Sequence, residues 1–172
     1  MEVNLMPVAI SYEFDPNDYL KAREFLLKQR DPHFHKSQRD DLFSMETGML
    51  SPKGRVHFRL GPCINSRLAE FPSEERGPVV REACRIIDNA IHRGYHLYPC
   101  NYIAYDEYHN TSRFGAYYTE TDVNSFDAYI NSQLDKVDVV DVTDEERAYM
   151  RHMMLMMYAN PVVNQLRANE SR

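Results

Sequence analysis

The chain has 172 residues, of which 43% are hydrophobic and 12% aromatic, and it contains few glycines. This length supports one domain with its own core, and this composition excludes a disordered chain. The net charge of −6 argues against a nucleic-acid partner, because nucleic-acid-binding surfaces are usually basic. No stretch approaches the roughly 20 apolar residues that span a bilayer, and no signal peptide opens the chain. We therefore expect a cytoplasmic location, either free or peripheral at the inner membrane.

Three cysteines, Cys63, Cys84 and Cys100, are widely spaced and form no Cys-x-x-Cys pair. They are typical of reduced thiols rather than of a disulfide framework. Cys84 falls on the apolar stripe of an expected helix, so we predict that it is buried. The histidines and cysteines lack the tight spacing of a zinc site, and we expect neither a metal nor a cofactor.

The first expected element is a strand over residues 3–12, an apolar run that is typical of an interior strand in an α/β sheet. A helix over 17–30, stopped by Asp31-Pro32, and a short helix over 40–47, ended by Gly48, should follow. Residues 55–60 alternate polar and apolar, which predicts a second strand with Val56, Phe58 and Leu60 facing inward.

The clearest helical pattern covers residues 74–93 and is closed by Gly94; its apolar stripe predicts core packing. Residues 95–108 carry tyrosines about three residues apart, which favours a short helix that places rings at the rim of the core.

Two capped helices are expected in the last third of the chain. Thr119 should cap one, and Thr143 with Glu146 forms a capping box for another that ends at Asn160-Pro161. Residues 136–142 fit either a short strand or an extended linker. Five methionines between positions 150 and 157 fit either a core helix or a surface for acyl chains, a bilayer or another subunit.

Three stretches carry a resemblance to a known family. The run Met6-Pro7-Val8-Ala9-Ile10 is similar to the last of the four sequence blocks of the glycerolipid acyltransferases, which include the lysophosphatidic-acid acyltransferases. Residues 54–62 look like the strand and turn after that block, and residues 96–106 look like the tail of some bacterial members. The resemblance implies that Pro7, Val8 and Ile10 contact substrate. It also implies an acyl donor, either acyl-CoA or acyl-carrier protein, and a lysophospholipid or glycerol phosphate acceptor.

The catalytic blocks of that family are not found ahead of Pro7. The family needs a His-x-x-x-x-Asp block, whose aspartate orients a histidine general base, and a Glu-Gly-Thr-Arg-like block that holds phosphate. Only six residues precede Pro7. The resemblance therefore implies that residues 1–172 are a single domain, the helix-rich C-terminal portion of a larger acyltransferase-like α/β domain. Amphipathic helices should cover its strands, about 3–12 and 55–60, and the chain alone should be inactive, with no catalytic residue of its own.

The chain contains one match to the His-x-x-x-x-Asp spacing, at a position that does not fit the family. His35 and Asp40 satisfy His-x-x-x-x-Asp, but they follow the Pro-Val-x-Ile run and lie in a charged segment, so we interpret the match as coincidence.

Two other functions stay open. The first is a non-catalytic protein-binding or assembly module, with a homo-oligomer as one form. The second is a cysteine hydrolase built on Cys63 or Cys100, which ranks last because neither cysteine has a supporting motif. The acyltransferase hypothesis also predicts a poorly covered sheet edge beside residues 5–11, where strands are missing.

Overall fold

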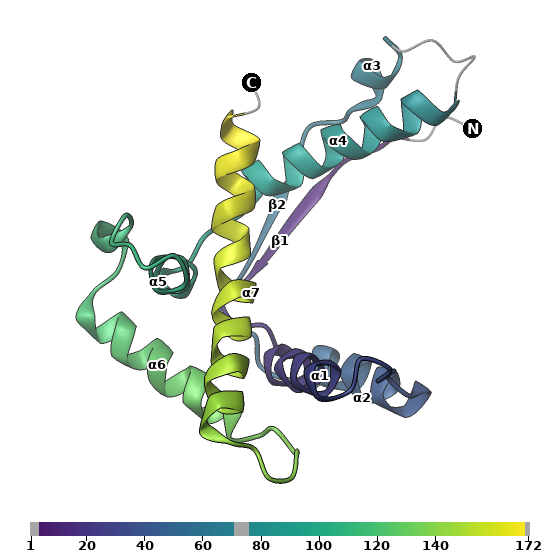
Figure 1. Cartoon of the computed structure of the whole chain (residues 1–172). Coiled ribbons are helices and arrows are strands. Elements are labelled where there is room, and N and C mark those ends of the chain that lie inside the picture. The colour runs from purple at the N-terminus through teal and green to yellow at the C-terminus, as the bar shows by residue number, and fades with distance from the viewer. Residues whose placement is uncertain (1–3, 71–75, 171–172) are drawn as a thin grey trace. The chain divides into compact units, whose positions relative to one another are not determined.

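The computed structural model describes residues 4–70 and 76–170, which form a helix-rich protein with one small antiparallel sheet (Figure 1). In chain order the elements are β1 (Val8–Tyr12), α1 (Asp18–Arg30), α2 (Gln38–Leu50), β2 (Val56–Leu60), α3 (Asn65–Leu68), α4 (Arg76–Gly94), α5 (Pro99–Tyr108), the 3-10 turn η1 (Gly115–Tyr117), α6 (Glu120–Leu134) and α7 (Asp144–Glu170).

The chain divides into two compact units, each of which is described by itself. The first takes in the chain up to Ser11, Val56–His96 and the chain from Val163 onward. The second takes in Tyr12–Arg55 and Leu97–Val162. The single acyltransferase-like domain over residues 1–172 stays a prediction.

The main hydrophobic core lies in the second unit. It collects side chains from α1, α5, α6 and α7, including the fully buried Leu26, Ile130 and Met154. Met150 is also buried, whereas Met153, Met156 and Met157 are half-buried. The methionine-rich segment is therefore mainly a core element, the plainer of the two interpretations that the sequence allowed.

Local capping signals set several helix starts. Thr119 accepts the Asp122 amide and Thr143 accepts the Glu146 amide, each at 3.2 Å, which confirms both predicted caps. Arg30 extends the second cap, because its guanidinium donates to Glu146 at 2.6 Å and to the Val140 carbonyl at 3.1 Å. The segment between α6 and α7 is a loop rather than a strand.

Two predicted helix ends are wrong. Gly48 lies inside α2, where the missing Cβ leaves room for the Asn17 side chain. Pro161 lies inside α7, which continues to Glu170. Beyond Pro161, tertiary contacts hold the helix: Gln165 donates to the Tyr95 carbonyl (2.9 Å) and Arg93 to the Ala168 carbonyl (2.8 Å). Such contacts outweigh the amide hydrogen bond that proline cannot make.

The first unit contains the sheet and α4. The start of the expected helix over 74–93 falls partly outside the described residues, as does residue 3 of the expected first strand. Within α4, Ile86 is buried as predicted, but Cys84 and Val80 are exposed. The prediction that Cys84 belongs to the core is therefore wrong, because the apolar stripe of α4 is wider than the surface that covers it.

Candidate functional site

The sheet has one uncovered face that carries a group of exposed apolar side chains. The Gly61 amide donates to the Pro7 carbonyl at 2.7 Å, which sets the antiparallel register of β1 and β2. This register places Val8 opposite Leu60 and Ile10 opposite Phe58, on the same face. These four residues, together with Val56, form what we call the open sheet face.

Every side chain of the open sheet face is exposed to solvent. The exposed fractions are 39% for Val8, 43% for Ile10, 64% for Phe58 and 69% for Leu60. The expectation that Val56, Phe58 and Leu60 face inward is therefore wrong. Alternation showed correctly that they share a face, but it could not show whether anything covers that face.

On the opposite face β1 lies against α4, whereas His57 and Arg59 of β2 are exposed. Ala9 is 2% exposed, and a Cβ on Gly94 would lie 2.8 Å from the Ala9 Cβ, so only glycine allows this close approach. Ser11 accepts the His96 amide at 2.9 Å, and the His57 and His96 rings lie 4.8 Å apart. Helical cover on this face confirms part of the predicted arrangement.

The three residues that the resemblance marks as substrate contacts do not share one environment. Pro7 is buried, and its carbonyl holds the turn at Gly61. Val8 and Ile10 lie on the open sheet face, beside Phe58 and Leu60. In the described part of the chain β1 has only one partner strand, so its other edge carries no strand.

The His35–Asp40 match has a structural explanation. Asp40 accepts the Ser37 amide at 3.0 Å and the Ser37 hydroxyl at 2.6 Å, which closes the capping box of α2. These bonds hold the pKa of Asp40 below its ordinary value. The carboxylate is therefore committed to the start of a helix, while His35 is exposed in the preceding segment.

Cys100 is not placed to act as a nucleophile. Cys100 is buried, donates to the Glu13 carbonyl at 3.1 Å, and burial raises its pKa to about 12. A thiol with this pKa stays protonated near neutral pH and attacks poorly. Cys63 and Cys84 are exposed. This geometry removes Cys100 from the cysteine-hydrolase hypothesis.

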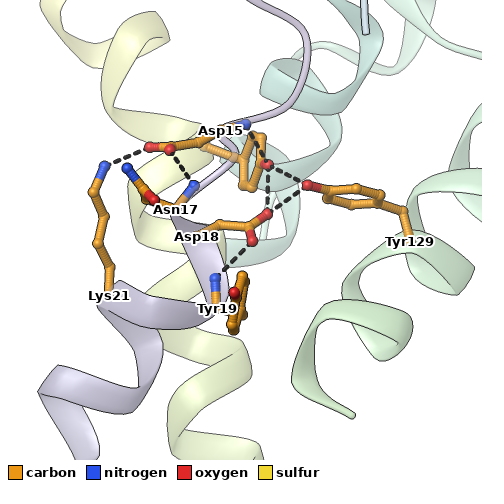
Figure 2. Close-up of polar contacts among 7 residues, drawn as sticks. Asp15, Asn17, Asp18, Tyr19, Lys21 and Tyr129 are labelled. Carbon is orange, nitrogen blue, oxygen red and sulfur yellow. Dashed lines mark hydrogen bonds and ion pairs between the residues drawn. The ribbon is translucent and has the colours of Figure 1, made fainter. Parts of the chain in front are cut away.

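The most concentrated polar cluster is a buried carboxylate with two tyrosines (Figure 2). Asp18, the first residue of α1, is fully buried. Its Oδ2 accepts the hydroxyl of Tyr129 from α6 at 2.6 Å and the hydroxyl of Tyr158 from α7 at 2.8 Å. Its Oδ1 accepts the Tyr19 amide at 2.6 Å. We call these residues the Asp18 cluster.

The electrostatics of the Asp18 cluster favour a structural role. Burial raises the pKa of Asp18, whereas the two tyrosine hydroxyls oppose that shift. Burial and the nearby carboxylate also raise the pKa of both tyrosines. The Asp15 amide donates to the Tyr158 hydroxyl at 3.0 Å, which ties the incoming loop to the cluster. Because Asp18 has no solvent exposure, substrate has no direct access to its carboxylate.

Sequence reasoning placed Asp18 only at the start of the helix expected over residues 17–30 and did not detect this cluster. Tyr129 and Tyr158 lie 111 and 140 residues away along the chain. No local spacing signals such a convergence.

A second apolar surface lies on α2, in the other unit. Five large side chains of α2 are at least half exposed: Leu42, Phe43, Met45, Met49 and Leu50. Two other residues of α2 lie toward α1 and its N-cap: the carboxylate of Asp40 is 3.9 Å from the guanidinium of Arg23, and Gly48 adjoins the side chain of Asn17. We call the five exposed side chains the α2 apolar face.

Across the residues that the structure describes, no group of three or more His, Cys, Asp or Glu side chains is arranged to hold a metal ion. In the same residues, none of the helices combines the length and apolarity that crossing a membrane requires.

Comparison with protein-family models, with curated proteins and with solved structures finds no match to this chain.

Proposed function

We propose that this chain is the C-terminal portion of a bacterial glycerolipid acyltransferase domain of the lysophosphatidic-acid type. The complete domain transfers a fatty acyl group from acyl-CoA or acyl-carrier protein to a lysophospholipid or glycerol phosphate. It works in the cytoplasm, peripherally at the inner membrane. One observation carries the proposal: the run that resembles the fourth block of the family leads into β1, where its Val8 and Ile10 are exposed on the open sheet face.

The two faces of β1 differ in whether another element packs against them. Interior strands of α/β domains are normally buried on both faces, whereas β1 has helical cover on one face only. Burying a side chain of the size of Ile10 or Phe58 stabilises a protein by about 1.5–3 kcal/mol. A contiguous apolar face of this kind marks a surface that another element covers. In the proposal, further strands and helices of the acyltransferase domain cover it.

The contribution of this chain is to position rather than to catalyse. The resemblance implies that a histidine outside these residues removes the proton of the acceptor hydroxyl. The hydroxyl oxygen then attacks the thioester carbonyl carbon, the carbon–sulfur bond breaks, and the thiolate leaves and takes up a proton. Pro7 fixes the backbone at the start of β1. Val8 and Ile10 supply apolar contacts beside the substrate site.

The proposal is tested on the native protein. We expect a C-terminal epitope tag on the chromosomal gene to reveal a polypeptide well above 20.2 kDa. Immunopurified, that polypeptide should transfer a labelled acyl group from palmitoyl-CoA to lysophosphatidate. The purified 172-residue chain should show no transfer under the same conditions. A native mass of 20.2 kDa, or a larger polypeptide without transfer activity, would contradict the proposal.

The second candidate is a non-catalytic protein-binding or assembly module. The α2 apolar face favours it, because this face lies in the other unit from the open sheet face. A chain that associates as its concentration rises, and that binds neither palmitoyl-CoA nor lysophosphatidate, would favour this candidate.

A further inference from the structure

The first unit contains a hollow of about 260 Å³ whose charged lining residues are all arginines. They are Arg59 from β2, Arg67 from α3 and Arg93 from the last turn of α4, and all three belong to the same unit. None of the described residues that line the hollow is acidic. Positive charge is thus concentrated here in a chain whose net charge is −6. We call this hollow the arginine hollow.

The packing of β2 near α4 places Arg59 at the arginine hollow. Strand alternation puts Arg59 on the face of β2 opposite to Phe58 and Leu60. A Cβ on Gly94 would lie 3.7 Å from the Cδ of Arg59, so the aliphatic part of the arginine passes close to the helix backbone. Arg59 as a whole is exposed, as is usual for an arginine that packs its stem and keeps its guanidinium in water.

The remaining lining of the arginine hollow is uncharged. Ile86, which is 2% exposed, and Ala90 contribute apolar surface from α4, and Gly61-Pro62 contribute the turn after β2. Asn89 is the one uncharged polar side chain among the described lining residues, and its amide group can donate to an anion. Because apolar walls keep part of the surrounding water away, they strengthen the attraction between a guanidinium and an anion.

Two of the three arginines form no ion pair with the residues that the structure describes. Among the ion pairs of that part of the chain, none involves Arg59 or Arg67. Glu82 on α4 pairs with Arg85 instead. Arg85 also lowers the pKa of Glu82 most, and Arg67 adds only a weaker attraction. The charges of Arg59 and Arg67 are therefore available to an anionic ligand.

Arg93 adds a third positive charge to the same lining. Its Nε donates to the carbonyl of Ala168 at 2.8 Å, and this bond holds the base of the guanidinium against α7. Like charges that line one hollow repel each other, so an anion inside it stabilises the arrangement.

We propose that the arginine hollow binds the phosphate group of a phosphate monoester. A guanidinium presents its N–H donors as a planar fork that matches the oxygens of a phosphate. A monoester carries nearly two negative charges at neutral pH, which match the two arginines without an ion pair. The volume of about 260 Å³ lies below the roughly 300–1,000 Å³ of pockets for drug-sized ligands, so it suits the phosphate and a few neighbouring atoms.

Isothermal titration calorimetry of the 172-residue chain with glycerol 3-phosphate tests the proposal. We expect saturable binding that weakens as the salt concentration rises, and no binding of glycerol. Arg59→Gln and Arg67→Gln should each weaken binding about ten- to a hundredfold, because each removes a charged hydrogen-bond donor. Arg81→Gln is the matched control: it removes the same charge from an exposed position of α4 that does not line the hollow, and it should have no effect.

An isosteric variant tests the site from the helix side. Asn89→Asp keeps the size of the side chain but places a negative charge among the arginines. We expect it to abolish binding of glycerol 3-phosphate and to raise the melting temperature, because the new carboxylate takes the place of the anion. Asn124→Asp, at an exposed position of α6, should leave binding unchanged. Circular dichroism checks that each variant is folded.

A vesicle assay distinguishes a soluble phosphate monoester from a lipid headgroup. The chain is sedimented with phosphatidylcholine vesicles that contain phosphatidate and with vesicles of phosphatidylcholine alone. Binding of glycerol 3-phosphate supports the proposal with a soluble ligand. Binding only to phosphatidate vesicles, weakened by Arg59→Gln, supports it with a lipid headgroup.

Three outcomes would overturn the proposal. They are a chain that binds neither probe, binding that Arg59→Gln and Arg67→Gln leave unchanged, and an equal loss of binding in Arg81→Gln. The proposal does not rest on the acyltransferase proposal, since the Glu-Gly-Thr-Arg-like block that holds phosphate in that family is a different set of residues. Binding is measured on the 172-residue chain without acyl transfer, so failure of one proposal leaves the other standing.

Discussion

At the scale of single residues, Asp18 shows how a charge is accommodated inside this protein. Carboxylates are rarely fully buried unless they are paired or hydrogen-bonded. Asp18 has no cation among its bonded partners; it accepts two tyrosine hydroxyls and one backbone amide. These bonds favour the charged form but do not cancel the effect of burial, because the pKa of Asp18 remains raised.

The raised pKa of Asp18 gives stability a defined pH dependence. The folded pKa lies above the unfolded value, so the stability that this group contributes is fully present below the unfolded pKa and is lost as pH rises through the folded pKa. Tyr129→Phe removes a hydroxyl that favours the charged carboxylate, and this raises the folded pKa further. We expect a loss of about 1–3 kcal/mol in the free energy of unfolding at neutral pH, and a smaller loss near pH 4.

Urea denaturation of Tyr129→Phe and of the native chain at the two pH values measures this difference. Tyr117→Phe is the control, because it removes the same hydroxyl from a side chain that is 59% exposed. If Tyr129→Phe lowers the free energy of unfolding equally at both pH values, or more in acid, the Tyr129 hydroxyl does not favour the charged form of Asp18, and the prediction is wrong.

At the scale of elements, adjacent residues of β1 have opposite environments. Ala9 is buried against α4 at Gly94, whereas Ile10 is exposed on the open sheet face. In a hydrophobic strand, substitution of the larger apolar residue is usually expected to cost more stability. In β1 we expect the reverse, because the smaller residue is the buried one.

Substituting threonine at each position tests this inversion, because threonine keeps strand propensity at both sites. We expect Ala9→Thr to lower the free energy of unfolding by about 1–3 kcal/mol, since the added atoms have no room at Gly94. Ile10→Thr should cost less than about 1 kcal/mol, because its side chain is already partly in water. Chemical denaturation of the two variants gives the comparison, and a larger cost for Ile10→Thr would show that the open sheet face is covered in solution.

Element boundaries and capping were largely predictable from the sequence, because capping and turn signals are local. Thr119, Thr143 and Asp31-Pro32 each determine a boundary through neighbours within a few residues. The covering of faces was not predictable. Periodicity grouped Val56, Phe58 and Leu60 correctly, but whether a face is buried depends on segments far away in the chain. The burial of Asp18 and the continuation of α7 past Pro161 could not be predicted from the sequence for the same reason.

At the scale of the whole molecule, the two units differ in the size of their cores. The second unit holds the main cluster of buried side chains, drawn from four helices. In the first unit the fully or nearly fully buried apolar residues include Ala9, Ile64, Ile86 and Ala168. The free energy of local unfolding rises with the amount of buried apolar contact, so we expect the two units to unfold locally with different free energies.

Hydrogen exchange followed by mass spectrometry should resolve this difference. We expect amides in β1 and β2 to exchange at least about tenfold faster than amides in residues 126–134 and 150–158, because the open sheet face lacks cover. Equal protection in the two units would contradict the expectation. In the native protein, the acyltransferase proposal predicts slower exchange of β1 than in the isolated chain.

The long separations within the Asp18 cluster also bear on the order of events during synthesis. Asp18 emerges from the ribosome 111 residues before Tyr129 and 140 residues before Tyr158. Until both tyrosines have been translated, the Asp18 carboxylate has neither hydroxyl donor and is most stable hydrated at the surface of the nascent chain. Closing such long loops is entropically costly, so α1 can form early by local interactions but must wait to dock. Completion of the second unit is thereby coupled to the arrival of α7.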